Sequence, residues 1–279
     1  MCPMSTRLFP FLFLLAACGA GSADAPNGVP SAKRPNVLIV ISDDLASVAT
    51  GTWAPSGRSL VPTPGIDALA RRGVVFERAL CASPFCTPSR QSFLTGRWPH
   101  AIRVTQLKST LPVDSPTLGT VFRDAGYRTA AIGKMHWMRT RVGQVEFGFD
   151  RIVGKIEWQA QLTPEERLIL DEYNRGWSRA ERQGWSMSNP QSAPLPLAEE
   201  RQMSPFLLQE AMEFMDEDSD KPFLAFLSLG EPHAPFHFPP RLLKSVDSSA
   251  LALPQVDEDR QAREVLGLAA MLKSRRALK

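Results

Sequence analysis

An unbroken run of large aliphatic side chains, Val37 to Ile41, is the feature that most restricts the fold of this 279-residue chain. The run does not alternate with polar residues, which predicts a central strand of a parallel sheet, covered on both faces. Two further apolar runs, Thr129 to Ile132 and Phe223 to Leu229, predict buried strands of the same sheet. Because helical segments separate these runs, the pattern indicates an α/β fold with a mainly parallel central sheet and helices on both faces.

Start and stop signals place the helices between these strands. Gly73 ends the first helix, and the strand-like run Val74 to Phe76 follows it. Gly126 ends the second. The predicted helices begin at Thr63-Pro64, at Leu118, at the capping box Thr163 to Glu166, and at Ser204-Pro205.

The N-terminal segment differs in character from the rest of the chain. Arg7 and the short apolar run that follows it predict an export signal over residues 1–17. Leu15 to Cys18 resembles a bacterial lipobox, so we expect Cys18 to become the lipid-anchored first residue, and residues 18–34 to form a polar tether. Plain secretory cleavage near residue 17 or 20 is the alternative. Either route takes the protein out of the cytoplasm, to a bacterial periplasm or cell envelope.

Charge and cysteine content exclude some classes of function. The net charge of +3 is small and its basic residues are scattered, so nucleic acid is not implied as a partner. Cys2 lies in the signal and Cys18 in the lipobox, which leaves Cys81 and Cys86. A bridge between these two would close a small loop and silence Cys86, and it remains an alternative to a reactive Cys86.

Polar side chains follow each of the three predicted strands. Asp43 and Asp44 follow the first strand, Lys134 and His136 the second, and His233 the third. Because parallel sheets bind ligands at the carboxyl ends of their strands, we expect these side chains to meet at one edge. The sequence therefore predicts a site that combines metal ligands, a cation and imidazoles.

The segment from Cys86 to Arg97 reads C-T-P-S-R-Q-S-F-L-T-G-R. It resembles the signature of the type I, formylglycine-dependent sulfatases of the alkaline-phosphatase-like superfamily, in both its C-x-P-S-R core and its L-T-G-R end. The resemblance implies that a separate maturation enzyme oxidises Cys86 to 3-oxoalanine (formylglycine), which attacks the sulfur of a sulfate ester. Pro88 suits the first turn of a helix whose positive end faces an anion, and Arg90 would hydrogen-bond to the modified side chain.

The resemblance also implies a metal site. It assigns Asp43, Asp44 and the oxygens derived from Cys86 as ligands of a divalent cation, with Ca²⁺ as the usual ion and Mg²⁺ as the other candidate. The metal would lower the pKa of the formylglycine hydroxyl and neutralise a sulfate oxygen.

Three further side chains receive roles from the same resemblance. Gly126 to His136 resembles the family's second motif, in which Lys134 binds a sulfate oxygen and His136 takes the proton whose loss releases sulfate. His233, in E-P-H-A-P-F, resembles the late histidine that contacts the substrate sulfate and protonates the leaving oxygen. Among the remaining histidines, His100 and His237 are candidates only for the rim. Residues 177–196 are either a pocket-shaping loop or a surface insertion.

The resemblance runs from Pro35 to about residue 240 and then weakens. In the family a later strand supplies further metal ligands, but no apolar strand ending in Asp-Asn or Asp-His follows His233 here. Asp257 to Asp259 is typical of a loop and cap before the helical run Ala262 to Ala277. We therefore expect residues 35–279 to be an incomplete sulfatase N-terminal catalytic domain, with the C-terminal part of the fold missing.

The resulting expectation is a sulfuric ester hydrolase that acts on a sulfated small molecule or glycan. Two alternatives stay open. A phosphonate or phosphodiester hydrolase of the same fold would use the same nucleophile and metal. A non-catalytic pseudoenzyme that binds sulfated glycans without turnover would fit the reduced ligand set.

Overall fold

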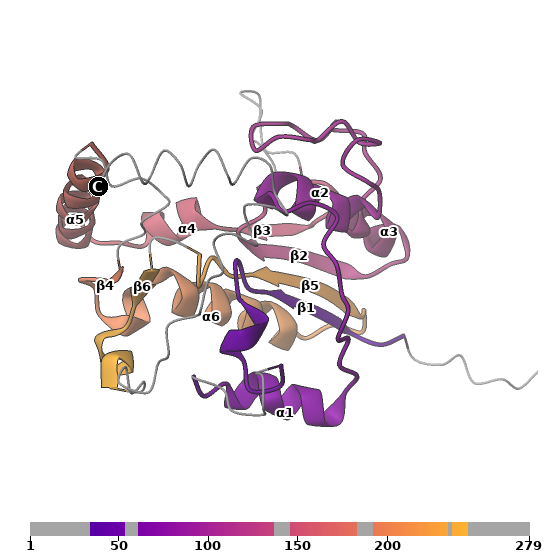
Figure 1. Ribbon diagram of the computed structural model, residues 1–279. Helices are drawn as coiled ribbons and strands as arrows, with labels where there is room; N and C mark the ends of the chain where they lie inside the picture. Colours follow the sequence, from indigo (N-terminus) through magenta and orange to yellow (C-terminus); the bar gives the residue numbers. More distant parts are fainter. Residues whose placement is uncertain (1–33, 54–60, 137–145, 183–191, 234–235, 245–279) are drawn as a thin grey trace, which may run out of the picture. The chain divides into compact units, whose positions relative to one another are not determined.

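The structure is a computed structural model that describes residues 34–53, 61–136, 146–182, 192–233 and 236–244 (Figure 1). The described residues from Pro35 onwards belong to one compact unit. The predicted signal, almost all of the tether and the predicted C-terminal helix lie outside the described residues, as do residues 183–191 of the segment 177–196.

A four-stranded parallel sheet lies at the centre of the described fold, in the order β1-β5-β2-β3 (Figure 1). The three predicted runs form three of its strands, which confirms the α/β architecture with a parallel sheet. In register, Ile41 lies opposite Ser228, which in turn lies opposite Gly133, so β1, β5 and β2 end at the same level. The strands are β1 (Val37–Ile41), β5 (Phe223–Ser228), β2 (Arg128–Gly133) and β3 (Arg151–Val153).

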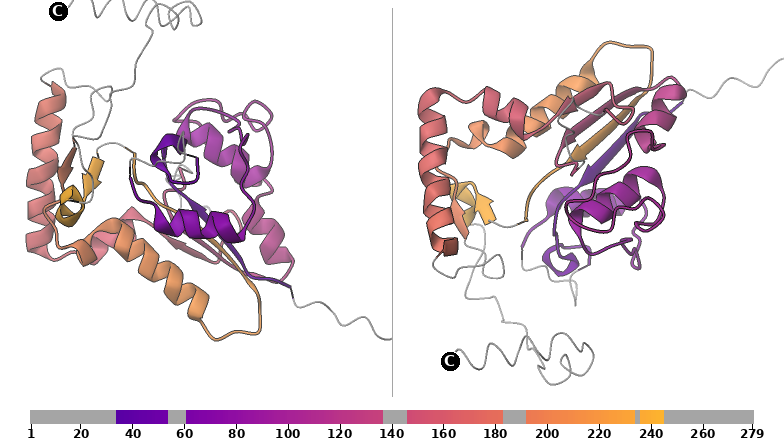
Figure 2. Two further views of the ribbon diagram at one scale, coloured as in Figure 1. Left: turned by 60° about the horizontal axis from the view of Figure 1, so that its bottom comes forward. Right: turned by 90° about the horizontal axis from the view of Figure 1, so that it is seen from above.

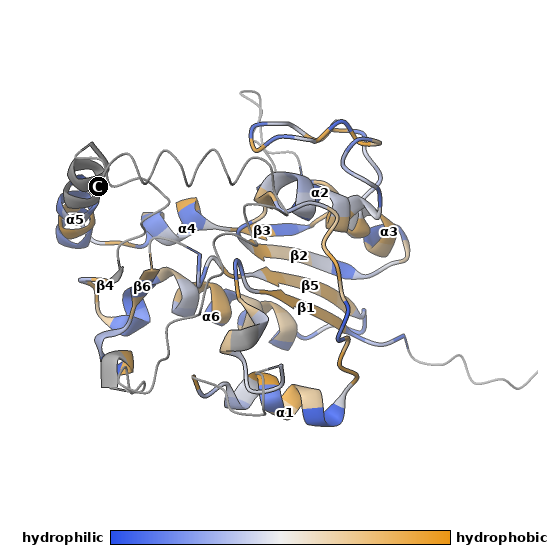
Figure 3. Ribbon diagram, in the orientation of Figure 1, coloured by the Kyte–Doolittle hydropathy of each residue, from blue (hydrophilic) through white to orange (hydrophobic). Residues whose placement is uncertain are grey.

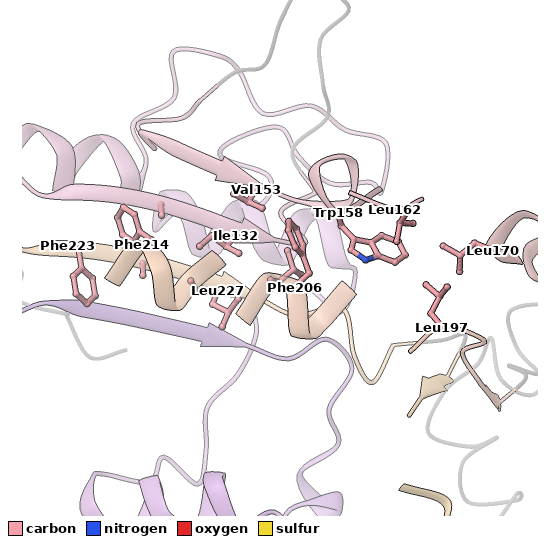
Figure 4. Packing of buried hydrophobic residues seen from close by; sticks show 14 residues of the cluster. Ile132, Val153, Trp158, Leu162, Leu170, Leu197, Phe206, Phe214, Phe223 and Leu227 are labelled. Carbon is pink, nitrogen blue, oxygen red and sulfur yellow. The ribbon is translucent and has the colours of Figure 1, made fainter. Parts of the chain in front are cut away.

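Helices cover both faces of this sheet. On one face, α6 (Met203–Asp216) packs against β5 and β2, and its Phe206 and Phe214 join Ile132 and Leu227 in one apolar cluster (Figure 4). On the other face, α2 (Cys86–Thr95) and α3 (Leu118–Asp124) pack over a second cluster. Figures 1 and 2 show α6 and the α2–α3 pair on opposite sides of the strands. Apolar burial on both faces is what fixes the sheet in place.

The other elements lie around this sheet. The predicted starts of α1, α3 and α5 are confirmed, whereas α6 begins at Met203, one residue before the predicted Ser204. At the start of α5 the amide of Thr163 donates to the Glu166 carboxylate at 2.8 Å, and Glu166 N donates to Thr163 Oγ1 at 3.2 Å. No described helix has the length and apolar character needed to span a membrane. The remaining elements are η1 (Ser47–Ala49), α1 (Pro64–Arg72), α4 (Lys155–Ala160), α5 (Pro164–Arg182), β4 (Ser192–Pro194), η3 (Glu199–Arg201), β6 (Phe236–Phe238), which pairs with β4, and η4 (Pro240–Lys244).

Two expectations about the strands are wrong. β1 is not covered on both faces: it is an edge strand among the described residues, with Leu38 47% and Val40 55% exposed (Figure 3). The segment Val74 to Phe76 is not a strand, and its residues Val74 and Phe76 are exposed. A strand requires a neighbour to satisfy its backbone hydrogen bonds, and none of the strands described here lies alongside this segment.

Candidate active site

A cavity of about 370 Å³ lies between the carboxyl end of β1 and the start of α2. Asp43 follows β1 by two residues, Lys134 directly follows β2, and α2 carries Cys86 and Arg90 to the same place. Asp43, Asp44, Cys86 and Arg90 all line the cavity. The in-register strand ends thus bring together side chains that are far apart in the sequence.

Cys86 is the first residue of α2, directly after the extended residue Phe85. Its thiol is half-buried, and both Cys86 and the exposed Cys81 are free, so the alternative disulfide is not formed. Pro88 lies in the first turn, where its missing N–H leaves no hydrogen bond unmade. Cys86 therefore lies at the positive end of a ten-residue helix, which favours a negative charge there.

Asp43 is buried between two cations. Its carboxylate forms an ion pair with Lys134 Nζ, and its Oδ1 lies 3.5 Å from Arg90 Nη2. Burial alone raises the pKa of Asp43, but the hydrogen bond and charge of Lys134, with the charge of Arg90, outweigh it and lower the pKa below 3.8. Asp43 is therefore an ionised, buried carboxylate at neutral pH.

Arg90 is held away from solvent by Lys134 and Ser228. Its Nη1 donates to the carbonyl oxygen of Lys134 at 2.7 Å and to Ser228 Oγ. Ser228 Oγ donates to the same carbonyl at 2.7 Å, and the Lys134 amide donates to the Ser228 carbonyl at 2.7 Å. Ser228 thus fixes the peptide of Lys134 from two sides. Ser228 was not predicted from the sequence, although a hydroxyl at the end of an apolar strand run was the signal available.

The loop after β2 turns sharply through two residues with positive φ. Gly133 has φ +100°, and His136 has φ +54°, which is uncommon for a residue with a side chain. Gln91 Nε2 donates to the carbonyl oxygen of His136 at 2.9 Å. Gln91 was also missed. The signal for it was a long polar side chain one turn after Thr87, on the buried side of α2.

His136 is neutral at physiological pH. Burial first, then the positive charges of Lys134 and Arg90, lower its pKa from 6.5 to about 4. Its Nδ1 is buried and makes no hydrogen bond within the described part of the chain. A neutral imidazole in this position is able to accept a proton.

His233 and the acidic pair complete the cluster. Asp43, Cys86 and His233 each offer a potential ligand atom, and these atoms lie within 4.8 Å of one another. His233 Nε2 is also 3.8 Å from Asp44 Oδ2. The carboxylates of Asp43 and Asp44, with an oxygen in place of the Cys86 sulfur, are the kind of ligand that a hard divalent cation prefers. Ca²⁺ takes roughly six to eight oxygen ligands, which is more than these residues offer, so water would complete its coordination shell.

The two other histidines lie elsewhere. His237 is on β6, where its ring packs edge-on against Tyr173 with centroids 5.1 Å apart. Burial lowers the pKa of His237. His100 is exposed in the turn that follows α2. Neither residue lines the cavity next to Cys86.

Comparison with known proteins identifies the family of the chain. The family model described as Sulfatase matches residues 35–270. The human steryl-sulfatase is 37% identical over 145 residues, which cover 48% of this chain and 23% of that protein. The dog N-acetylgalactosamine-6-sulfatase is 26% identical over 250 residues, covering 81% of this chain and 44% of that protein. The chain thus spans less than half the length of these relatives.

Solved structures share the fold. A phosphonate monoester hydrolase from Agrobacterium radiobacter superimposes with a TM-score of 0.62 at 21% identity, covering 85% of this chain and 49% of that one. A structure in complex with its substrate D-glucosamine-2-N,6-O-disulfate superimposes with a TM-score of 0.54 at 22% identity, covering 81% of this chain and 40% of that one. At such identities the likeness extends to the fold alone.

Proposed function

Because this chain belongs to the sulfatase family, we propose that it carries the nucleophile, the anion-binding groups and part of the metal site of a sulfuric ester hydrolase. One observation supports this most: Cys86, at the positive end of α2, shares a cavity with the buried Asp43 and lies in one cluster with it and His233. These groups come from separate parts of the sequence and meet only in the folded chain.

The proposed chemistry also needs a modified side chain and a metal ion. Formylglycine made from Cys86 supplies an oxygen nucleophile where the thiol now lies. A divalent cation, Ca²⁺ or Mg²⁺, held by Asp43, Asp44 and that oxygen, supplies positive charge beside it. The donor types at this edge suit such an ion, and a maturation enzyme is the implied partner.

The chain's own residues bind the substrate and move protons. Lys134 and the amino end of α2 attract the anionic ester, and Arg90 keeps Lys134 in place through its carbonyl oxygen. His233 contacts the sulfate and donates a proton to the leaving oxygen. His136, which is neutral at pH 7, accepts the proton whose loss releases sulfate.

The proposed substrate is a sulfated small molecule or glycan. The relatives include a sulfatase named for N-acetylgalactosamine 6-sulfate and a structure bound to a disulfated glucosamine. Export through residues 1–17, with a lipid anchor at Cys18, would place the site where such extracellular compounds occur.

Turnover of matched esters tests this function. The full chain, co-expressed with a formylglycine-generating enzyme and supplied with Ca²⁺, is assayed with the sulfate, phosphodiester and phosphonate esters of 4-nitrophenol. We expect the sulfate ester to react fastest, Cys86→Ala to abolish turnover and Cys81→Ala to retain it. Faster phosphodiester or phosphonate turnover would instead identify a phosphoryl hydrolase. Binding of sulfated sugar without turnover would identify a pseudoenzyme.

A further inference from the structure

Two consecutive side chains of α2 hold the loop that carries Lys134 and His136. Arg90 Nη1 donates to the carbonyl oxygen of Lys134 at 2.7 Å, and Gln91 Nε2 donates to that of His136 at 2.9 Å. α2 begins at Cys86. The helix that presents Cys86 therefore also fixes the backbone from which the lysine and the histidine project.

The peptide that Gln91 holds is unusual. His136 has φ +54°, a left-handed conformation that is unfavourable for a residue with a Cβ and persists only where the surroundings hold it. The amide of Gln91 supplies such a contact, since it binds the carbonyl oxygen of His136 itself. A change in φ at this residue would redirect its imidazole.

Stability does not explain the presence of an amide at position 91. Gln91 is 1% exposed, and its Oε1 is buried without a hydrogen-bond partner in the part of the chain that the structure describes. A buried polar atom left unpaired costs free energy, and an apolar side chain of similar size would avoid that cost. What the amide provides here is the donor to His136.

We propose that Gln91 is a positioning residue: it holds the peptide of His136 in the left-handed conformation and so fixes where the imidazole lies relative to Lys134. The inference rests on the proposed function, because it gives Gln91 a part in the proton transfer assigned there to His136. If the inference holds, the reaction depends on Gln91 in addition to the residues named above.

Substitutions at Gln91 separate its donor from its shape. Gln91→Met removes the donor at similar volume. Gln91→Glu keeps the shape but sets an acceptor against the His136 carbonyl. Gln202→Met is the matched control, because Gln202 is also buried and its Nε2 donates to a backbone carbonyl, that of Leu197, at 3.1 Å, at the start of α6.

Measurements of kcat and KM distinguish a role of Gln91 in placing His136 from a role in the stability of the fold. We expect both Gln91 variants to lower kcat by about 10- to 100-fold with KM changed less than about twofold, as for a misplaced catalytic group. Gln202→Met, which likewise removes a buried amide donor, should leave kcat unchanged. Native kcat in the Gln91 variants, or an equal loss of kcat in Gln202→Met, would overturn the proposal.

A second readout needs no turnover. The chain has four histidines, so in protein labelled with ¹³C-histidine the Cα resonance of His136 can be assigned by single His→Gln variants. We expect it to lie in the range of left-handed backbone and to leave that range in Gln91→Met but not in Gln202→Met. An unmoved resonance in Gln91→Met would overturn the proposal even if kcat fell. If the native chain hydrolyses none of the three esters, the proposed function fails, and this resonance still decides whether Gln91 holds His136.

Discussion

At the scale of single residues, Asp43 lies between two cations that keep its carboxyl ionised. Its pKa is lowered in the folded chain, so its interactions stabilise the fold above pH 3.8 and are lost as the pH falls through the lower, folded-state pKa. A cation bound at Asp43 would compete with Lys134 for the same carboxylate. The ion pair is therefore best tested without metal.

Lys134→Ala should destabilise the chain in EDTA at pH 7 by about 1–3 kcal/mol, because it removes a hydrogen bond between charged groups at a buried carboxylate. The deficit should begin to shrink near pH 3.8, as Asp43 becomes protonated. Urea unfolding of the native chain and the variant at a series of pH values measures it. Lys221→Ala, at an exposed lysine, is the control. A deficit that persists unchanged to low pH would show that it does not come from the pair with Asp43.

His136 also makes the chain less stable as the pH falls, but in a higher pH range than Asp43. Its folded-state pKa of about 4 lies below 6.5, so the unfolded chain takes up the proton first, and the native chain loses stability as the pH falls from 6.5 towards 4. His136→Gln should flatten this slope in Tm and lower kcat by about 100- to 10,000-fold. His100→Gln, at an exposed position, should change neither. An unchanged slope in His136→Gln would contradict the buried, neutral state of this imidazole.

At the scale of elements, β2 packs tightly against β5 at Gly133. This residue has φ +100°, and a Cβ on it would lie 2.0 Å from the carbonyl oxygen of Ser228. That carbonyl also accepts the hydrogen bond from the Lys134 amide. The close approach of the two strands therefore helps to place the lysine at the cavity.

Gly133→Ala should destabilise the chain by about 3 kcal/mol or more, because both the backbone strain and the clash require the strands to move. Gly65→Ala in α1, where a Cβ would meet nothing within 4 Å, is the control and should change the free energy of unfolding by less than about 1 kcal/mol. Equal midpoints of denaturation for the two variants would contradict the close approach.

The elements that could be predicted from the sequence are those whose signal lies within a few consecutive residues. The apolar runs at β1, β2 and β5 and the cap at Thr163 carry their signals within a few residues, and each is confirmed. The strand expected at Val74 to Phe76 failed because a strand also needs a neighbour. β3 was too short, at three residues, to give a signal.

The same distinction holds for the site. Asp43, Lys134 and His233 were predicted to meet because they follow strands that end together. Gln91 and Ser228 were not predicted to join the site. Gln91 takes part through a hydrogen bond to a residue 45 positions away in the sequence, and Ser228 through a hydrogen bond to a residue 94 positions away. Side-chain contacts over such separations depend on the packed structure and leave no local pattern.

At the scale of the whole molecule, β1 has an open outer edge among the described strands. Leu38 and Val40 are about half exposed on one face of this strand. An exposed apolar edge strand is a template for pairing with another chain. The isolated 279-residue chain should therefore associate with itself.

Val40→Lys should reduce this association, because a charge on an edge strand opposes pairing between sheets. Sedimentation velocity at micromolar concentrations should show a shift towards monomer, with the far-UV circular dichroism unchanged. Leu69→Lys, at an exposed position of α1, should leave the distribution as it is. A native chain that is monomeric at these concentrations would contradict the open edge.

The chemistry proposed for the site depends on Cys86 being converted to formylglycine, and the mass of one peptide tests this directly. Trypsin releases residues 79–90 as a single peptide that contains both free cysteines, so Cys81 is an internal control. From a host with the maturation enzyme, we predict a peptide about 18 Da lighter than the dithiol, with fragmentation placing the change at Cys86, a modification distinct from ordinary thiol oxidation. A peptide in which both cysteines remain thiols would contradict the proposed nucleophile.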